Sequence, residues 1–109
     1  MNILISGSRG FIGKKLLNYL INKNFKIKKI YILDRNNNIK NNFDNKNICI
    51  ISLQTLQNNT IKIDTIIHLA SKAHVKNFKE SDLKYNFKLT NKLIVFSKIN
   101  KVSKFIFLS

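Results

Sequence analysis

The chain has 109 residues, of which 44% are hydrophobic, and this length suits one small domain rather than two. No apolar run approaches the roughly 20 residues of a membrane-spanning helix, and the first residues lack the pattern of a signal peptide. We therefore expect a cytoplasmic protein without a membrane partner. The single cysteine, Cys49, excludes an internal disulfide and a multi-cysteine metal site, and we expect no metal.

The net charge of +15 comes from 20 basic and 5 acidic residues and would ordinarily indicate a polyanion partner. However, Lys, Asn and Ile dominate the composition, and all three are encoded largely by A/T-rich codons, so base bias also explains the charge. The lysines are scattered and lack the interleaved aromatic residues of a single-strand-binding platform. We expect no nucleic-acid partner, and a basic nucleic-acid-binding protein remains a minor alternative.

Short apolar runs predict five strands, at residues 2–6, 28–33, 48–51, 65–69 and 104–108. Helical spacing of apolar residues predicts helices at about 11–21 and 82–100, the second with Ser81 as its N-cap. The Asn-rich residues 35–47 are predicted to form a loop or a poor helix. Continuous apolar strands joined by helices or crossovers predict a Rossmann-like, doubly wound parallel α/β sheet of about five strands, in the order 3-2-1-4-5.

The only three glycines of the chain, Gly7, Gly10 and Gly13, lie between the first predicted strand and the first predicted helix. In a phosphate-binding turn, Gly7 would permit the tight turn, Gly10 would let the backbone approach a pyrophosphate, and Gly13 would let the helix pack close on the sheet. Free N–H groups and the positive end of the helix dipole then face the phosphates. An ordinary tight turn is the alternative, but this spacing in a glycine-poor chain favours a dinucleotide site.

Asp34 ends the second predicted strand. Its carboxylate could accept hydrogen bonds from both hydroxyls of an adenine ribose and would repel a 2′-phosphate, so NAD is favoured over NADP as the cofactor. Arg9 and Arg35 would both be within reach of a 2′-phosphate, which keeps NADP open. A turn-initiating aspartate is the alternative interpretation of Asp34.

Four ordered segments carry a resemblance over the whole chain: SGSRGFIG at 6–13, DTIIHLAS at 64–71, YNFKLT at 85–90 and VSKFIFLS at 102–109. They resemble motifs of the extended short-chain dehydrogenases/reductases that act on nucleotide sugars, the NAD-dependent epimerase/dehydratase group. The segment HLASKAHV at 68–75 is further similar to a branch of UDP-N-acetylhexosamine 4-epimerases or 4-keto reductases involved in surface-polysaccharide synthesis.

The resemblance implies a cofactor site built from the glycine turn and the ends of the second and fourth strands. The implied residues are Gly7, Ser8, Arg9, Gly10, Phe11, Ile12, Gly13, Asp34, Arg35, Leu69, Ala70 and Ser71. Asn86 would correspond to the helix asparagine that supports the active-site hydrogen bonds, or it is simply one Asn of an Asn-rich chain. The family uses neither His68 nor His74 as its acid/base, so we expect both to be structural. Ser52 stands where the family often has an Asp that meets the adenine amino group.

In the family, a tyrosine removes the sugar hydroxyl proton with help from a lysine four residues later, and hydride passes to the nicotinamide. The one such pair here, Tyr19 and Lys23, falls in the predicted first helix, away from the nicotinamide. We therefore expect residues 1–109 to be the N-terminal cofactor-binding domain of a nucleotide-sugar epimerase/dehydratase, truncated before the last strands and substrate domain and inactive alone. A stand-alone NAD(H)-binding module or a gene remnant is the alternative.

Overall fold

The computed structural model describes residues 1–8, 10–22, 26–34, 47–58, 60–69 and 80–108, so nearly all of the predicted Asn-rich loop lies outside it. The strands are β1 (Asn2–Ser6), β2 (Lys29–Leu33), β3 (Ile48–Ile51), β4 (Thr65–His68) and β5 (Lys104–Phe107). The helices are α1 (Phe11–Asn22), α2 (Leu53–Gln57) and α3 (Glu80–Ile99). None of these helices is long and apolar enough to cross a membrane.

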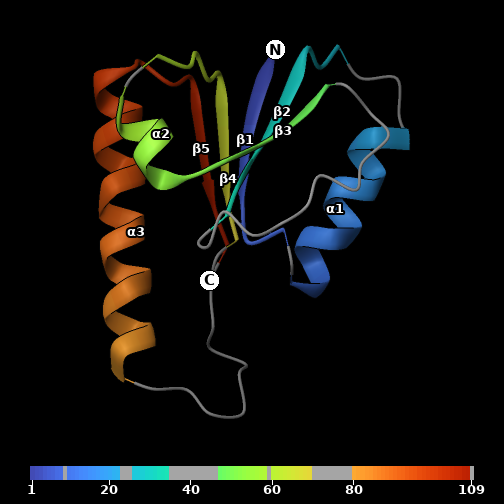
Figure 1. Ribbon diagram of the computed structural model, residues 1–109. Coiled ribbons are helices and arrows are strands. Elements are labelled where there is room, and N and C mark those ends of the chain that lie inside the picture. The colour runs from blue at the N-terminus through green and yellow to red at the C-terminus, as the bar shows by residue number, and fades with distance from the viewer. Residues whose placement is uncertain (9, 23–25, 35–46, 59, 70–79, 109) are drawn as a thin grey trace.

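All five strands pair in parallel in one sheet of order β3-β2-β1-β4-β5, which confirms the predicted topology. Helix α1 covers one face of the sheet, whereas α2 and α3 cover the other (Figure 1). The register pairs Ser6 with Leu33 on one side and with His68 on the other, so the carboxyl ends of the strands meet at one edge. Strands β2 and β3 are added on one side of β1, whereas β4 and β5 are added on the other side. Ligands of doubly wound sheets bind beside such a switch point, here between β1 and β4.

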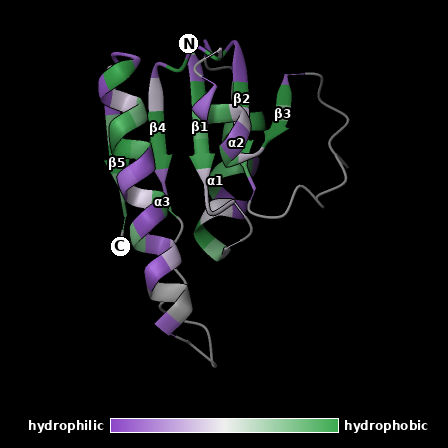
Figure 2. Cartoon of the chain, turned by 60° about the vertical axis from the view of Figure 1, so that its left-hand side comes forward, coloured by the Kyte–Doolittle hydropathy of each residue, from purple (hydrophilic) through white to green (hydrophobic). Residues whose placement is uncertain are grey.

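The central residues of β1, Ile3 to Ile5, are apolar and buried, as expected for a strand that is covered on both faces of the sheet. Leu4, which is fully buried, packs into the cluster under α2 and α3, together with Ile66 and Leu93. Ile3 and Ile5 point to the other face and pack with Leu17 of α1. Figure 2 shows that the strands of the sheet are mostly hydrophobic, whereas hydrophilic and hydrophobic residues alternate along α3.

Helix α2 was not predicted from the sequence. It has only five residues, and Ser52 caps it by accepting a hydrogen bond on Oγ from the Thr55 N–H, at 3.1 Å. The prediction of Ser81 as the N-cap of α3 is wrong, since the helix already includes Glu80. Cys49 of β3 is half-buried.

Candidate cofactor site

The loop after β1 turns sharply at Gly7, whose φ of 85° lies in the left-handed region that favours glycine. Within the loop, the Gly10 N–H donates to the Gly7 carbonyl oxygen at 3.1 Å. The Lys14 N–H then donates to the Gly10 carbonyl at 2.9 Å, which is the first bond of α1. The backbone therefore changes from strand to helix within four residues, and this geometry requires a residue without a side chain at Gly7.

Gly13 is required for a different reason, the close approach of α1 to the loop backbone. A Cβ atom at this position would lie 2.1 Å from the Gly7 carbonyl oxygen and 2.7 Å from Ser8 Cα. Both neighbours are backbone atoms, so they cannot move aside as a flexible side chain would. The close neighbour of Gly13 is thus the loop, rather than the sheet as we expected.

Gly10 is exposed, and packing within the described chain does not require a glycine there. The nearest described atom to an added Cβ is the Gly7 carbonyl oxygen, at an ordinary contact distance of 3.5 Å. Open space therefore lies outside the loop at this residue. A glycine in such a place leaves room for a ligand to approach the backbone closely, as the pyrophosphate of a dinucleotide would.

The amino end of α1 faces the same side as the loop. Because the first helical bond starts at the Lys14 N–H, the amides of Phe11, Ile12 and Gly13 have no partner within the helix. The first turn carries no acidic residue that would neutralise the positive end of the helix dipole. The Lys15 ammonium lies 4.4 Å from the centre of the exposed Phe11 ring and adds positive charge. The arrangement suits an anion such as a diphosphate.

The residues that follow β2 and β4 lie beside the loop. Asp34 is only 6% exposed, and its N–H donates to the Ile51 carbonyl at 3.0 Å. On the other side of β1, the Leu69 N–H donates to the Ser6 carbonyl at 2.9 Å. Three neighbouring parallel strands therefore deliver Gly7, Asp34 and Leu69 to the same edge of the sheet (Figure 1). The predicted site residues Arg9, Arg35, Ala70 and Ser71 lie outside the described residues.

A sequence model described as the NAD dependent epimerase/dehydratase family matches residues 3–109. The chain belongs to this family. Among curated proteins, the epimerase/dehydratase chain is 37% identical to the dTDP-D-glucose 4,6-dehydratase of Dictyostelium discoideum over 123 residues. That match covers 98% of this chain and 28% of the Dictyostelium protein.

Two solved structures are similar to the epimerase/dehydratase chain in fold. The ADP-L-glycero-D-manno-heptose-6-epimerase of Helicobacter pylori superposes with a TM-score of 0.72 at 24% identity, over 97% of this chain and 38% of that one. The Bordetella bronchiseptica enzyme WbmH, solved in complex with NAD+, gives a TM-score of 0.59 at 22% identity, over 95% of this chain and 37% of that one. At these identities the likeness shows the fold alone. The chain thus spans between 28% and 38% of the length of these three proteins.

Asn86 and His68 of the epimerase/dehydratase chain are joined through Thr90. The His68 ring is fully buried, and its Nε2 lies 2.8 Å from Thr90 Oγ1, which in turn donates to the Asn86 carbonyl at 2.8 Å. On the other side of the ring, Nδ1 is hydrogen-bonded to Ser6 Oγ. Burial lowers the pKa of His68 below its usual value, which agrees with the expectation of a structural rather than acid/base histidine.

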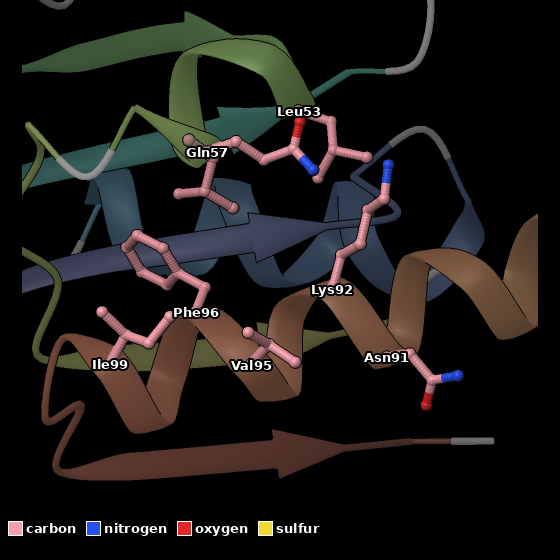
Figure 3. A pocket seen from close by; sticks show the side chains of 8 residues that line it. Leu53, Gln57, Asn91, Lys92, Val95, Phe96 and Ile99 are labelled. Atoms are coloured by element: carbon pink, nitrogen blue, oxygen red, sulfur yellow. The ribbon is translucent and has the colours of Figure 1, made fainter.

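A separate hollow lies between α2 and α3, lined mainly by apolar side chains that include Leu53, Val95 and Phe96 (Figure 3). Its volume of about 230 Å³ is below the range typical of small-molecule sites. It includes none of the predicted site residues. The hollow is therefore distinct from the candidate cofactor site at the carboxyl ends of the strands.

Proposed function

We propose that residues 1–109 form the NAD-binding part of an epimerase/dehydratase that acts on a nucleotide sugar. In this proposal the diphosphate lies against the loop after β1, and the adenine ribose lies against Asp34. The proposed cofactor residues are Gly7, Ser8, Arg9, Gly10, Phe11, Ile12, Gly13, Asp34, Arg35, Leu69, Ala70 and Ser71.

The observation that carries this proposal is the difference between Gly10 and Gly13. The protein's own backbone explains the glycine at position 13, because a Cβ there would collide with the loop. It does not explain the glycine at position 10, where a Cβ would have room. A bound diphosphate would use that room and would accept hydrogen bonds from the amides at the amino end of α1.

Asp34 supports NAD as the cofactor rather than NADP. Asp34 directly follows Leu33, which pairs with Ser6 next to the loop, so in this proposal its carboxylate accepts hydrogen bonds from the ribose hydroxyls. A 2′-phosphate at the same place would be repelled by that carboxylate and would have to be buried against it. The family's dependence on NAD agrees with this preference.

When bound, NAD supplies a nicotinamide ring that can take a hydride from the sugar. The chain's own residues would bind and orient that cofactor, but Tyr19 and Lys23 are the one tyrosine-lysine pair in its sequence with the four-residue spacing that the family uses for proton removal. Tyr19 lies in the third turn of α1, about 12 Å along the helix from its amino end. We therefore propose that residues 1–109 do not convert a sugar on their own.

The nucleotide-sugar class rests on two sources of support. One relative is named a dTDP-D-glucose 4,6-dehydratase, which acts on a nucleotide-linked hexose by its name. The segment at 68–75 resembles the branch with UDP-N-acetylhexosamine 4-epimerases or 4-keto reductases. We propose a nucleotide-linked hexose as the substrate of the whole enzyme and the cytoplasm as its location.

Calorimetric titration of the protein with NAD and with NADP tests this proposal. We expect saturable binding of NAD and weaker binding of NADP. In the Asp34→Ala variant, NAD should bind more weakly, and the difference in affinity between NAD and NADP should shrink or reverse. Absence of saturable NAD binding to the folded protein would contradict the proposal, and tighter binding of NADP by the unaltered protein would contradict the role of Asp34.

A further inference from the structure

The hydroxyl groups of Ser6 and Thr90 and the imidazole of His68 form a chain of hydrogen bonds next to the candidate cofactor site. Ser6 ends β1, His68 ends β4, and Thr90 lies in the middle of α3. Ser6 Oγ is hydrogen-bonded to Nδ1 of His68, and Nε2 of the same ring lies 2.8 Å from Thr90 Oγ1. Ser6 is 1% exposed and His68 is fully buried, so these bonds do not compete with bulk water.

The direction of each bond in this chain follows from its last acceptor. Thr90 Oγ1 donates its hydrogen to the Asn86 carbonyl oxygen at 2.8 Å, and a carbonyl can only accept. Thr90 Oγ1 therefore accepts from His68, so the ring carries its hydrogen on Nε2. A neutral ring then has a bare Nδ1, which must accept from the Ser6 hydroxyl. The ring is neutral because burial lowers its pKa.

One end of this chain of hydrogen bonds lies at the loop after β1, and the other end lies at the turn of α3 that carries Asn86. Ser6 directly precedes Gly7 of the loop, and the Ser6 carbonyl accepts from the Leu69 N–H at 2.9 Å. Thr90 lies one helical turn after Asn86 and bonds to its carbonyl. Phe107 packs against the ring with its centre 5.1 Å away, and Phe105 meets it edge-on at 6.4 Å, so the imidazole has little freedom to turn.

We propose that His68 is a positioning residue that, as the Nε2–H tautomer, fixes the cofactor loop after β1 relative to the turn of α3 that carries Asn86. The importance of this alignment for NAD rests on the proposed function above. The alignment itself does not depend on the proposed function, because every group in the chain of hydrogen bonds belongs to the protein.

The tautomer is tested first, by long-range ¹H–¹⁵N correlation spectra of the ¹⁵N-labelled protein at neutral pH without ligand. We expect the His68 ring to show a protonated Nε2 and a bare Nδ1. A ring protonated on Nδ1, or on both nitrogens, overturns the proposal. This measurement uses the unaltered protein and so does not depend on whether any variant folds.

The link that His68 makes between the loop after β1 and α3 is tested with Thr90→Val, which keeps the side-chain shape and removes the acceptor for His68. We expect the amide resonances of Gly7, Gly10 and Leu69 to shift and NAD to bind at least several-fold more weakly. Thr90→Ser, which keeps the hydroxyl, should restore both. The matched control is Ser97→Ala, which removes a similar bond to a carbonyl of α3, from Ser97 Oγ to Ile94 at 2.8 Å, without touching His68.

Equal effects of Thr90→Val and Ser97→Ala on the loop amides would overturn the positioning role and leave His68 as an ordinary core residue. Changes confined to α3 in Thr90→Val would overturn it as well. If the unaltered protein does not bind NAD but shows the expected tautomer and loop shifts, the proposed function fails while the positioning role stands.

Discussion

Gly10 lies in the loop after β1 and Gly13 in the first turn of α1, and the two positions differ in the space that they leave for a side chain. At Gly13 a Cβ would lie 2.1 Å from a backbone oxygen, whereas at Gly10 the nearest contact would be 3.5 Å. The sequence predicted the loop because three glycines between a strand and a helix are rare in this composition. It could not separate their roles, because the distances depend on how α1 folds back on the loop.

Gly13→Ala should lower the free energy of unfolding by about 1–3 kcal/mol or more, because the added methyl group collides with fixed backbone. The matched variant Gly10→Ala should cost no more than about 1 kcal/mol, mainly from a poorer residue at the start of α1. Urea unfolding followed by circular dichroism measures both. Equal losses of stability in the two variants would show that the loop does not have this geometry.

His68 predicts a dependence of stability on pH. Burial lowers the pKa of the folded state below the unfolded value of 6.5, so the unfolded chain binds the proton more readily. Stability is therefore fully present above about pH 6.5 and falls as the pH drops towards the folded-state pKa, by at most about 1.4 kcal/mol per pH unit for one proton. Among the described residues, Ser6, Phe105, Phe107 and Thr90 contact the ring from β1, β5 and α3, and none of these four ionises in this range.

Urea unfolding of the unaltered protein between pH 7.5 and 5 measures this dependence, with His68→Gln as the control. We expect the variant to be less stable at pH 7.5 but to lose less stability on acidification. A variant with the same pH dependence as the unaltered protein would assign the effect to other groups. The sequence marked His68 as a buried histidine but not its partners, because Ser6 and Thr90 are 62 and 22 residues away.

At the scale of the elements, the sequence predicted the strands to within one residue because each contains a short apolar run. Helix α2 was missed because five residues are too few to show helical spacing. Its signal was Ser52, whose hydroxyl accepts from the Thr55 N–H, ahead of Leu53 and Leu56, which both join the core cluster. Capping residues are thus more informative than periodicity for an element of this length.

Ser52→Ala should lower the free energy of unfolding by about 1 kcal/mol, because it removes the acceptor at the start of α2. Ser52→Asp is the control, since aspartate is an equally good N-cap and places a negative charge at the positive end of the helix. Thermal or urea unfolding of the three proteins gives the comparison. If the aspartate variant loses as much stability as the alanine variant, capping is not what Ser52 contributes.

At the scale of the whole molecule, the two edges of the sheet differ. In β3, Ile48 and Ile51 are 3% and 6% exposed, whereas in and after β5, Ile106, Phe107 and Leu108 are 44–50% exposed. A parallel strand with a continuous apolar run is normally covered on both faces, and an uncovered apolar edge strand invites pairing with another chain.

We expect residues 1–109 to associate as their concentration rises, because β5 offers both an unpaired edge and exposed apolar side chains. Light scattering after size exclusion should give an apparent mass above 12.7 kDa that increases with concentration. Ile106→Lys, which puts a charge on the exposed side of β5, should shift the protein towards the monomer. A monomer at all concentrations that unfolds cooperatively would contradict this expectation.

The proposed function depends most on the binding of a dinucleotide by the backbone of the loop after β1, and Gly10→Ala tests this binding directly. Calorimetric titration of NAD into the unaltered protein and into this variant should be compared after unfolding curves have shown that both are folded. We predict saturable binding by the unaltered protein and an affinity at least about tenfold lower in the variant, or about 1.4 kcal/mol. Equal affinities in the two folded proteins would contradict the account.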